Sequence, residues 1–170
     1  MQGAMKRALL AGIAALTATL LLASSASAST ATIIGTDTIK VTASENEVNR
    51  ILVTYAPGTD LYTITDSAAP IAAGGVCVVI DTHTVDCPGT GITTIDVDVG
   101  RANDTAELAR QSIPIAIAGK LTGDSGDDSL IGANGADSIQ GGSGKDRIDG
   151  KNGADDIRGG SNTDTLLYPA

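Results

Sequence analysis

The sequence predicts an all-β protein whose C-terminal part is built from short, regular repeats. A nine-residue repeat runs from Gly123 to the end of the chain. Segments rich in Thr, Val and Ile precede it, and their mostly alternating apolar and polar residues are typical of strands. No helical period of apolar residues occurs between residue 29 and about residue 118.

The repeat has four nearly constant columns in five in-frame blocks: GDSGDDSLI, GANGADSIQ, GGSGKDRID, GKNGADDIR and GGSNTDTLL. Position 1 is always glycine, at Gly123, Gly132, Gly141, Gly150 and Gly159. Position 4 is glycine except for Asn162 in the last block, and position 8 is always Leu or Ile. Position 6 is always aspartate, at Asp128, Asp137, Asp146, Asp155 and Asp164. A random Gly- and Asp-rich tail would not keep the aliphatic column in frame, so the repeats predict a folded structure.

These columns resemble the calcium-binding nonapeptide G-G-x-G-x-D-x-U-x of the repeats-in-toxin (RTX, hemolysin-type) family. The resemblance implies a parallel β-roll, a flattened calcium-binding β-solenoid in which each repeat is half a coil. Alternate repeats then share an edge, with Asp128, Asp146 and Asp164 on one edge and Asp137 and Asp155 on the other. The Asp carboxylates and the backbone carbonyls of the turns, including those of the position-1 glycines, are expected to bind about three Ca²⁺ ions.

The residue types suit this metal. Glycine permits a positive φ, and Asn162 is the best-tolerated substitute for it. Calcium takes roughly six to eight oxygen ligands, which two stacked turns can supply and one turn cannot. Because the ions also neutralise stacked carboxylates, we expect the repeats to fold only when calcium binds.

The N-terminus predicts a cleavable signal peptide over residues 1–28. Lys6 and Arg7 precede an apolar run over 8–23, and Ala26-Ser27-Ala28 precedes the cleavage point. The run is short for a membrane span, so we expect a secreted, extracellular protein without membrane insertion. The net charge of -9 argues against nucleic acid and anionic membranes as partners.

Cys77 and Cys87 are the two cysteines of the chain. In an oxidising compartment a disulfide between them is the expected state. The residues between them predict two short strands around a turn near Asp81 and Thr82, and therefore a hairpin closed by the disulfide.

The chain divides into the signal peptide 1–28, a small β-rich domain 29–91, a solenoid cap 92–122 and the repeats 123–170. Strands are predicted over 33–41, 50–55, 61–65, 76–80 and 92–99, with a turn at Pro57 and Gly58. In the cap, residues 100–105 resemble a degenerate calcium turn, with Asp104 at position 6 and Ala102 where glycine belongs. A cap is expected because a solenoid must cover its open end.

Catalytic motifs are absent or incomplete. His83 is the only histidine, which excludes a zinc-protease H-E-x-x-H helix, and it is expected at a solvated hairpin tip. The lipase elbow G-x-S-x-G is absent, and Ser125 in Gly-Asp-Ser-Gly occupies position 3 of a repeat, which disfavours a Ser-His-Asp triad. Acidic residues are so common in the chain that a pair of catalytic carboxylates, as in a glycosidase, could not be recognised among them. A carbohydrate cleft, however, usually needs aromatic residues, which make up 2% of the chain.

The sequence therefore predicts a secreted calcium-binding protein that is not an enzyme, similar to small actinobacterial secreted calcium-binding proteins. Its repeats would fold outside the cell and stabilise or display the N-terminal β-domain. Two alternatives stay open. One is a small extracellular hydrolase with a calcium-stabilised C-terminal module. The other is a calcium-dependent surface adhesin whose partner is a cell surface, a matrix or a second copy of the chain.

Overall fold

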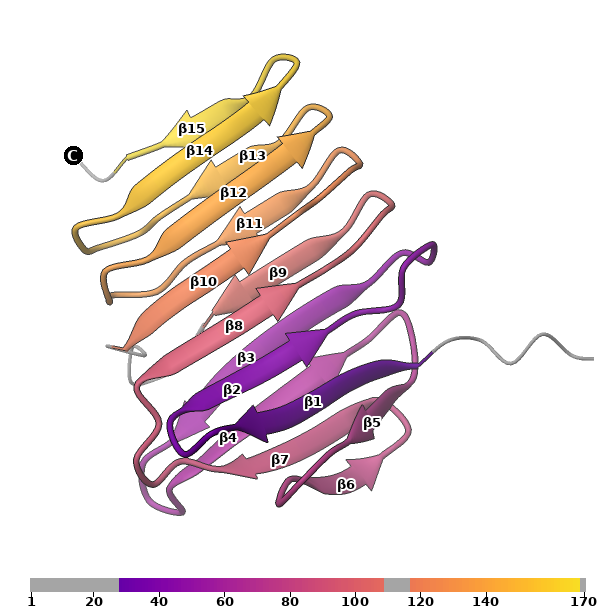
Figure 1. Cartoon of the computed structure of the whole chain (residues 1–170), viewed down its shortest axis with the longest axis vertical. Helices are drawn as coiled ribbons and strands as arrows, with labels where there is room; N and C mark the ends of the chain where they lie inside the picture. Colours follow the sequence, from indigo (N-terminus) through magenta and orange to yellow (C-terminus); the bar gives the residue numbers. More distant parts are fainter. Residues whose placement is uncertain (1–27, 109–116, 169–170) are drawn as a thin grey trace, which may run out of the picture.

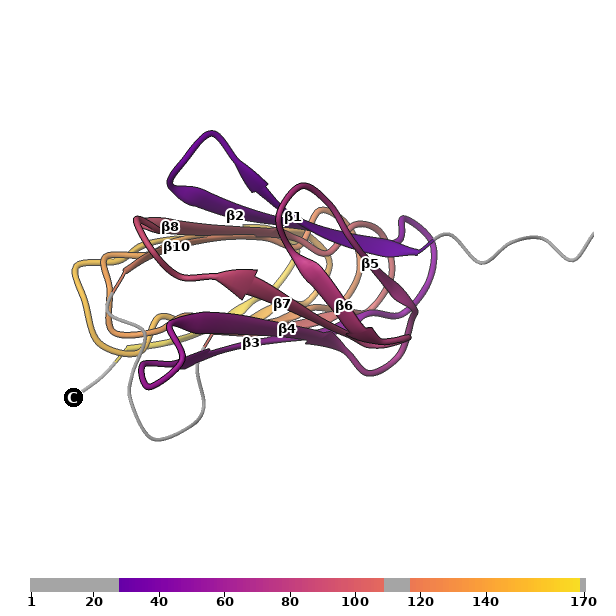
Figure 2. The ribbon, with the colours of Figure 1, turned by 90° about the horizontal axis from the view of Figure 1, so that it is seen from below.

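A computed structural model describes residues 28–108 and 117–168. The described residues form strands, turns and bends and contain no helix, so none could cross a membrane as a helix. Fifteen strands form two sheets that face each other (Figures 1 and 2). The strands are β1 (Ser29–Ile34), β2 (Thr38–Thr42), β3 (Arg50–Ala56), β4 (Leu61–Asp66), β5 (Ile71–Ala73), β6 (Val78–Asp81), β7 (Thr84–Pro88), β8 (Thr94–Asp98), β9 (Thr105–Leu108), β10 (Ala118–Thr122), β11 (Ser129–Ile131), β12 (Ser138–Ser143), β13 (Arg147–Asp149), β14 (Asp156–Ser161) and β15 (Thr165–Leu167).

From β8 onward, successive strands alternate between the two sheets. One sheet has the order β14-β12-β10-β8-β2-β1-β5, and the other has the order β15-β13-β11-β9-β3-β4-β7-β6. All neighbours from β8 to β15 within a sheet are parallel. This winding is the predicted parallel β-roll, and Figure 1 shows its strands stacked along the long axis.

The N-terminal region adds antiparallel strands to the same two sheets. β1 pairs antiparallel with β2, and β4 pairs antiparallel with both β3 and β7. β2 and β3 pair in parallel with β8 and β9, so they behave as one more coil of the roll. The divisions at 91/92 and 122/123 therefore fall within continuous mixed sheets.

One apolar core runs through the whole stack because alternate residues of each strand point inward. Ile95, Val97 and Val99 are fully buried, while Asp96 and Asp98 between them face outward, as the alternation predicts. The same core includes Leu130, Ile139 and Ile148 of the repeats. The roll and the N-terminal strands are therefore packed as one body.

Two predicted local structures are wrong. Segment 33–41 is not one strand, because the chain reverses at Gly35, whose φ is 66°, and forms the β1–β2 hairpin. His83 is not simply solvated: it is half-buried, and its Nδ1 lies 2.9 Å from the carbonyl oxygen of Asp66 and 3.0 Å from that of Ala69. The strands β5 (IAA) and β9 (TAEL) were not predicted, because neither is an alternating run rich in Thr, Val and Ile and neither carries the repeat motif.

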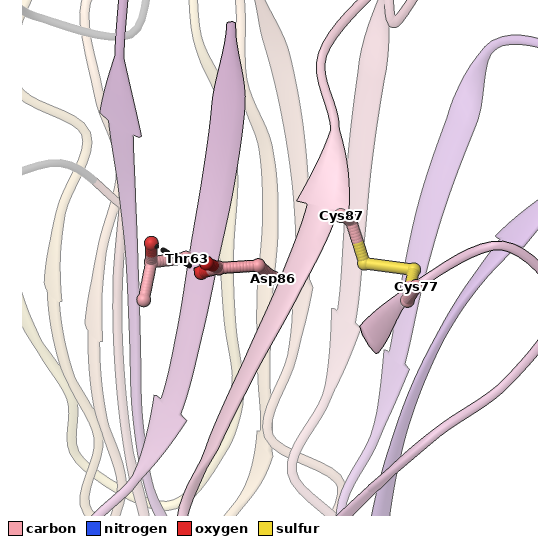
Figure 3. Close-up of a disulfide and its surroundings, with 4 residues drawn as sticks. All are labelled: Thr63, Cys77, Asp86 and Cys87. Atoms are coloured by element: carbon pink, nitrogen blue, oxygen red, sulfur yellow. Dashed lines mark hydrogen bonds between the residues drawn. A yellow bond between two sulfur atoms is a disulfide. The ribbon is translucent and has the colours of Figure 1, made fainter. Parts of the chain in front are cut away.

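The predicted disulfide joins Cys77, just before β6, to Cys87 on β7 and so closes the β6–β7 hairpin. The turn of this hairpin lies at Thr82 and His83, one residue later than predicted. Figure 3 shows the disulfide together with Asp86, which accepts a 2.7 Å hydrogen bond from Thr63 Oγ1 on β4. The predicted signal peptide lies outside the described residues, except for Ala28, as do residues 109–116 of the predicted cap.

Candidate metal centre

The nine-residue period places the repeat aspartates on two edges of the roll. Leu130 pairs with Ile148, which pairs with Leu166 in one sheet, and Ile139 pairs with Ile157 in the other. The turns before these strands therefore stack two repeats apart. The Asp128 edge carries Asp128, Asp146 and Asp164, and the Asp137 edge carries Asp137 and Asp155.

Stacked aspartates are linked by backbone-to-carboxylate hydrogen bonds. The backbone N–H of Asp128 donates to Oδ1 of Asp146 at 3.0 Å, and that of Asp146 donates to Oδ1 of Asp164 at 3.0 Å. On the other edge, Asp137 N–H donates to Oδ1 of Asp155 at 2.9 Å. These bonds fix one oxygen of each accepting carboxylate and leave its second oxygen, Oδ2, for another partner.

On the Asp128 edge this second oxygen is buried and has no hydrogen-bond partner. This holds for Oδ2 of Asp128 and Asp146 and for Oδ2 of Asp104, which lies in the turn before the repeats. All three residues are 2% exposed. A buried carboxylate oxygen without a donor is unfavourable, so a cation is the partner that this arrangement lacks. A fourth such oxygen, on Asp96, differs because Lys40 and Lys120 lie beside that carboxylate.

The position-1 glycines leave room next to these oxygens. A Cβ atom placed on Gly123 would come within 3.0 Å of both Asp128 Oδ2 and the carbonyl oxygen of Gly141 in the next coil. The same holds at Gly141, whose Cβ would meet Asp146 Oδ2 and the carbonyl oxygen of Gly159. Glycine is therefore required where a carboxylate and a carbonyl oxygen converge, which is a donor set that suits calcium.

Each candidate site must combine carboxylates with backbone oxygens. Within the described parts of the chain, no group of three or more His, Cys, Asp or Glu side chains converges on one point. Calcium accepts backbone carbonyls together with carboxylates, whereas zinc and other transition metals prefer imidazole and thiolate ligands. The residues present therefore fit Ca²⁺.

The electrostatics of the Asp128 edge favour a bound cation. Burial, together with the neighbouring negative charges, raises the pKa of Asp128 to about 7, although the hydrogen bond to its carboxylate from Asp104 N–H acts in the opposite direction. Burial also raises the pKa of Asp104, Asp137 and Asp146. A calcium ion would oppose these shifts, because it stabilises the ionised carboxylates.

The Asp137 edge differs from the Asp128 edge. Both carboxylate oxygens of Asp137 have donors, because Oδ1 accepts from Gly119 N–H and Oδ2 accepts from Ala133 N–H, both at 2.7 Å. Ala133 stands at position 2, where the motif has glycine, and it lacks the positive φ of Asp124, Lys151 and Gly142. With Ala133 at position 2, Oδ2 of Asp137 therefore has a backbone donor, which Oδ2 of Asp128 and Oδ2 of Asp146 lack.

All the predicted site residues lie in stacked turns of the roll, but their surroundings change along it. Asp128, Asp137 and Asp146 are buried, whereas Asp155 and Asp164, nearer the C-terminal end, are half-exposed. Sequence reasoning did not identify Asn49, whose buried side chain touches the Asp104 turn. No glycine pattern surrounds Asn49, so the repeat motif gives no signal for it.

The fold and its stacked acidic turns define a metal-binding repeat protein of the β-roll class. The family model for the RTX calcium-binding nonapeptide repeat (4 copies) matches residues 122–157 and 131–166. The C-terminal segment of this chain therefore consists of RTX calcium-binding repeats, and the match leaves residues 28–121 outside it. No curated protein and no solved structure matches the chain.

Proposed function

We propose that this chain is a secreted, non-catalytic calcium-binding protein. In this proposal, the repeats bind about three Ca²⁺ ions outside the cell and fold into the roll as they do so. The observation that carries the proposal is the pair of buried, unpartnered oxygens on Asp128 and Asp146, each next to a position-1 glycine of the repeats. The expected sites lie between Asp128 and Asp146, between Asp146 and Asp164, and between Asp137 and Asp155.

The continuity of the sheets supports a stabilising role for the roll. β3 pairs with β9, and β9 pairs with β11, so the hydrogen-bonded sheet runs from the N-terminal strands into the repeats without a break. The core is continuous as well. Ions that order the repeats would therefore also stabilise strands that carry no repeat motif, because ligand that binds only the folded state shifts folding of the whole body.

Secretion is part of the same proposal. The predicted signal peptide and the Cys77–Cys87 disulfide both suit an oxidising, calcium-rich compartment. Weak calcium sites would stay empty at cytosolic calcium concentrations and fill outside the cell.

A calcium titration tests this function. The purified protein is stripped with chelator, and its far-UV circular dichroism is recorded as calcium is added. We expect the β signal to rise between micromolar and millimolar calcium, and the Asp128→Asn/Asp146→Asn double variant to require much more calcium. Asp156→Asn is the matched control, because Asp156 is an exposed roll carboxylate paired outward with Arg158. A spectrum that ignores calcium, with no binding heat in calorimetry, would contradict the proposal.

A calcium-dependent surface adhesin is the second candidate, and one observation favours it. Val78, Val79 and Ile80 on the edge strand β6 are each more than half exposed, and Val76 just before it is 63% exposed. An edge strand with exposed apolar side chains can pair with another chain. Calcium-dependent particle size in light scattering would favour this candidate, and a constant monomer would count against self-assembly.

A further inference from the structure

The turn at residues 99–104 lies outside the matched repeats but has their geometry. Arg101 bridges to Ser125, which bridges to Ser143, and both serines stand at position 3 of a repeat. This register places Val99 at position 1 and Asp104 at position 6. Ala102, at position 4, has a φ of 154°, close to the 140° of Gly126 in the equivalent place. The turn therefore follows the backbone path of a calcium turn without the glycine that normally permits it.

Asp104 also has the hydrogen bonds of a repeat aspartate. Its N–H donates to Oδ1 of Asp128 at 2.8 Å, as Asp128 N–H donates to Asp146. Its own Oδ1 accepts from the backbone N–H of Asn49 at 2.7 Å. Its Oδ2 is buried without a partner in a residue that is 2% exposed. The only basic residue in this turn, Arg101, is exposed and lies beside Glu45, so it does not neutralise the carboxylate.

Asn49 occupies the position-6 level in the coil before Asp104. Thr105 N–H donates to the carbonyl oxygen of Asn49 at 3.0 Å, just as Ser129 N–H donates to that of Asp104 at 2.9 Å. The two N–H groups of Asn49 Nδ2 are shared among three backbone carbonyl oxygens, at 2.9 Å from Ser44, 2.8 Å from Glu47 and 3.1 Å from Val99, and Asp104 Oδ1 lies 3.4 Å away. The amide nitrogen of Asn49 therefore contacts several oxygen atoms, as a bound cation would.

The comparison between Asn49 and the repeat aspartates is direct. Asn49 presents an N–H group to the position-1 carbonyl of the next coil, that of Val99. Asp128 presents Oδ2 near the position-1 carbonyl of its next coil, that of Gly141. Two oxygens that face each other need a proton donor or a cation between them. Asn49 supplies the donor itself, and Asp128 cannot when it is ionised.

We propose that Asp104 and the turn 123–128 form a further calcium site, and that Asn49 ends the series of sites because its amide replaces the next ion. The position-1 carbonyl in this site is that of Gly123, which the register places level with Val99. The proposal rests on the proposed function, since it assigns one more ion of the same kind. It extends calcium binding one coil beyond the recognised repeats and into the region that carries the N-terminal strands.

Counting bound ions in paired variants tests this site. The full-length, disulfide-bonded protein is titrated with calcium, and the ions are counted by native mass spectrometry and by calorimetry. Asp104→Asn is expected to bind one ion fewer than the wild type and to stay folded, because the new amide can bond to the Gly123 carbonyl as Asn49 bonds to Val99. Asn49→Asp is expected to bind one ion more, since it restores a carboxylate at the next level.

The ion counts distinguish the further site at Asp104 from calcium binding by the repeats. Asp156→Asn serves as the control and is expected to keep the wild-type count. An unchanged count in Asp104→Asn overturns the new site while leaving the RTX repeats as calcium sites, and an unchanged count in Asn49→Asp overturns the role of Asn49. If Asp104→Asn does not fold, the wild-type count decides, because a count no higher than the roughly three ions expected for the repeats alone overturns the new site. A wild-type protein that binds no calcium overturns the proposed function itself.

Discussion

The carboxylate of Asp146 accepts a hydrogen bond from the backbone N–H of Asp128 at 3.0 Å, which joins two turns that are 18 residues apart. Asp146 N–H makes the equivalent bond to Asp164. Asp146 therefore lies between two stacked partners, whereas Asp164 has a repeat partner on one side only. The position of an aspartate in this series decides how many calcium sites depend on it.

Asp146→Asn is accordingly expected to impair two sites and Asp164→Asn one. Loss of a charged ligand should weaken each affected site at least tenfold, or about 1.4 kcal/mol. Calorimetry resolves the number of ions bound with high affinity in each variant. Equal losses in the two variants would show that the sites are not shared between neighbouring turns.

Low pH is expected to stabilise the calcium-free roll in part, because protonation of Asp128 neutralises its buried carboxylate as a calcium ion would. The pKa of Asp128 is raised from 3.8 to about 7 in the calcium-free roll, mainly by burial, whereas the unfolded chain ionises near 3.8. The folded form therefore holds an extra proton between these pH values, so its stability is highest at the acid end and falls as the pH rises towards about 7. In calcium-free solution, circular dichroism should show more β structure at pH 5 than at pH 8. The opposite order would contradict this.

Removing positive-φ strain should stabilise the roll. Asp124 stands at position 2 with a φ of 61°, it is exposed, and glycine fills this position in the third and fifth repeats. Asp124→Gly is expected to raise the free energy of unfolding by about 1 kcal/mol in saturating calcium. Asp124→Ala, which removes the charge but keeps the Cβ, is the control and should not stabilise. Thermal denaturation measures both variants.

The disulfide is expected to contribute stability without changing the number of calcium ions that the protein binds. Replacing both cysteines by serine should lower the free energy of unfolding by about 3 kcal/mol, as for other short loops, and Cys87 is fully buried. The Cys77–Cys87 pair lies beside β6 and β7, at the end of the sheet opposite to β15. Denaturation and calcium counting are made on the same sample. A reduced ion count would show that the disulfide-bonded hairpin and the calcium sites of the repeats depend on each other.

Core truncation should reveal how the roll loosens towards its C-terminal end. Ile148 is fully buried, whereas Ile157 is only partly buried although it occupies the same repeat position. Ile148→Ala is expected to cost about 2–5 kcal/mol, and Ile157→Ala clearly less, because part of its side chain already contacts water. Denaturation in saturating calcium makes the comparison. Equal losses of unfolding free energy in the two variants would indicate that Ile157 is as well shielded from water in solution as Ile148.

Much of the site could be predicted from the sequence because the repeat is a local pattern. A turn of fixed length needs glycine where φ is positive, a carboxylate at one position and an aliphatic residue two positions later. These needs recur every nine residues, and the half-coil repeat that the RTX resemblance implies then places Asp128, Asp146 and Asp164 on one edge. The all-β class and most of the strands were predicted from the same kind of local pattern, and the disulfide from two cysteines in a chain expected to be secreted.

The tertiary structure alone decided how the N-terminal region joins the roll. Asn49 and Asp104 are 55 residues apart, and their contact depends on β2 and β3 entering the sheets beside β8 and β9. No period in the sequence encodes that pairing, because it arises from strands that bury a common core. The sequence by itself therefore determined what each turn can bind, and the packing of distant strands determined where the series of turns begins and which aspartate oxygens are left without a partner.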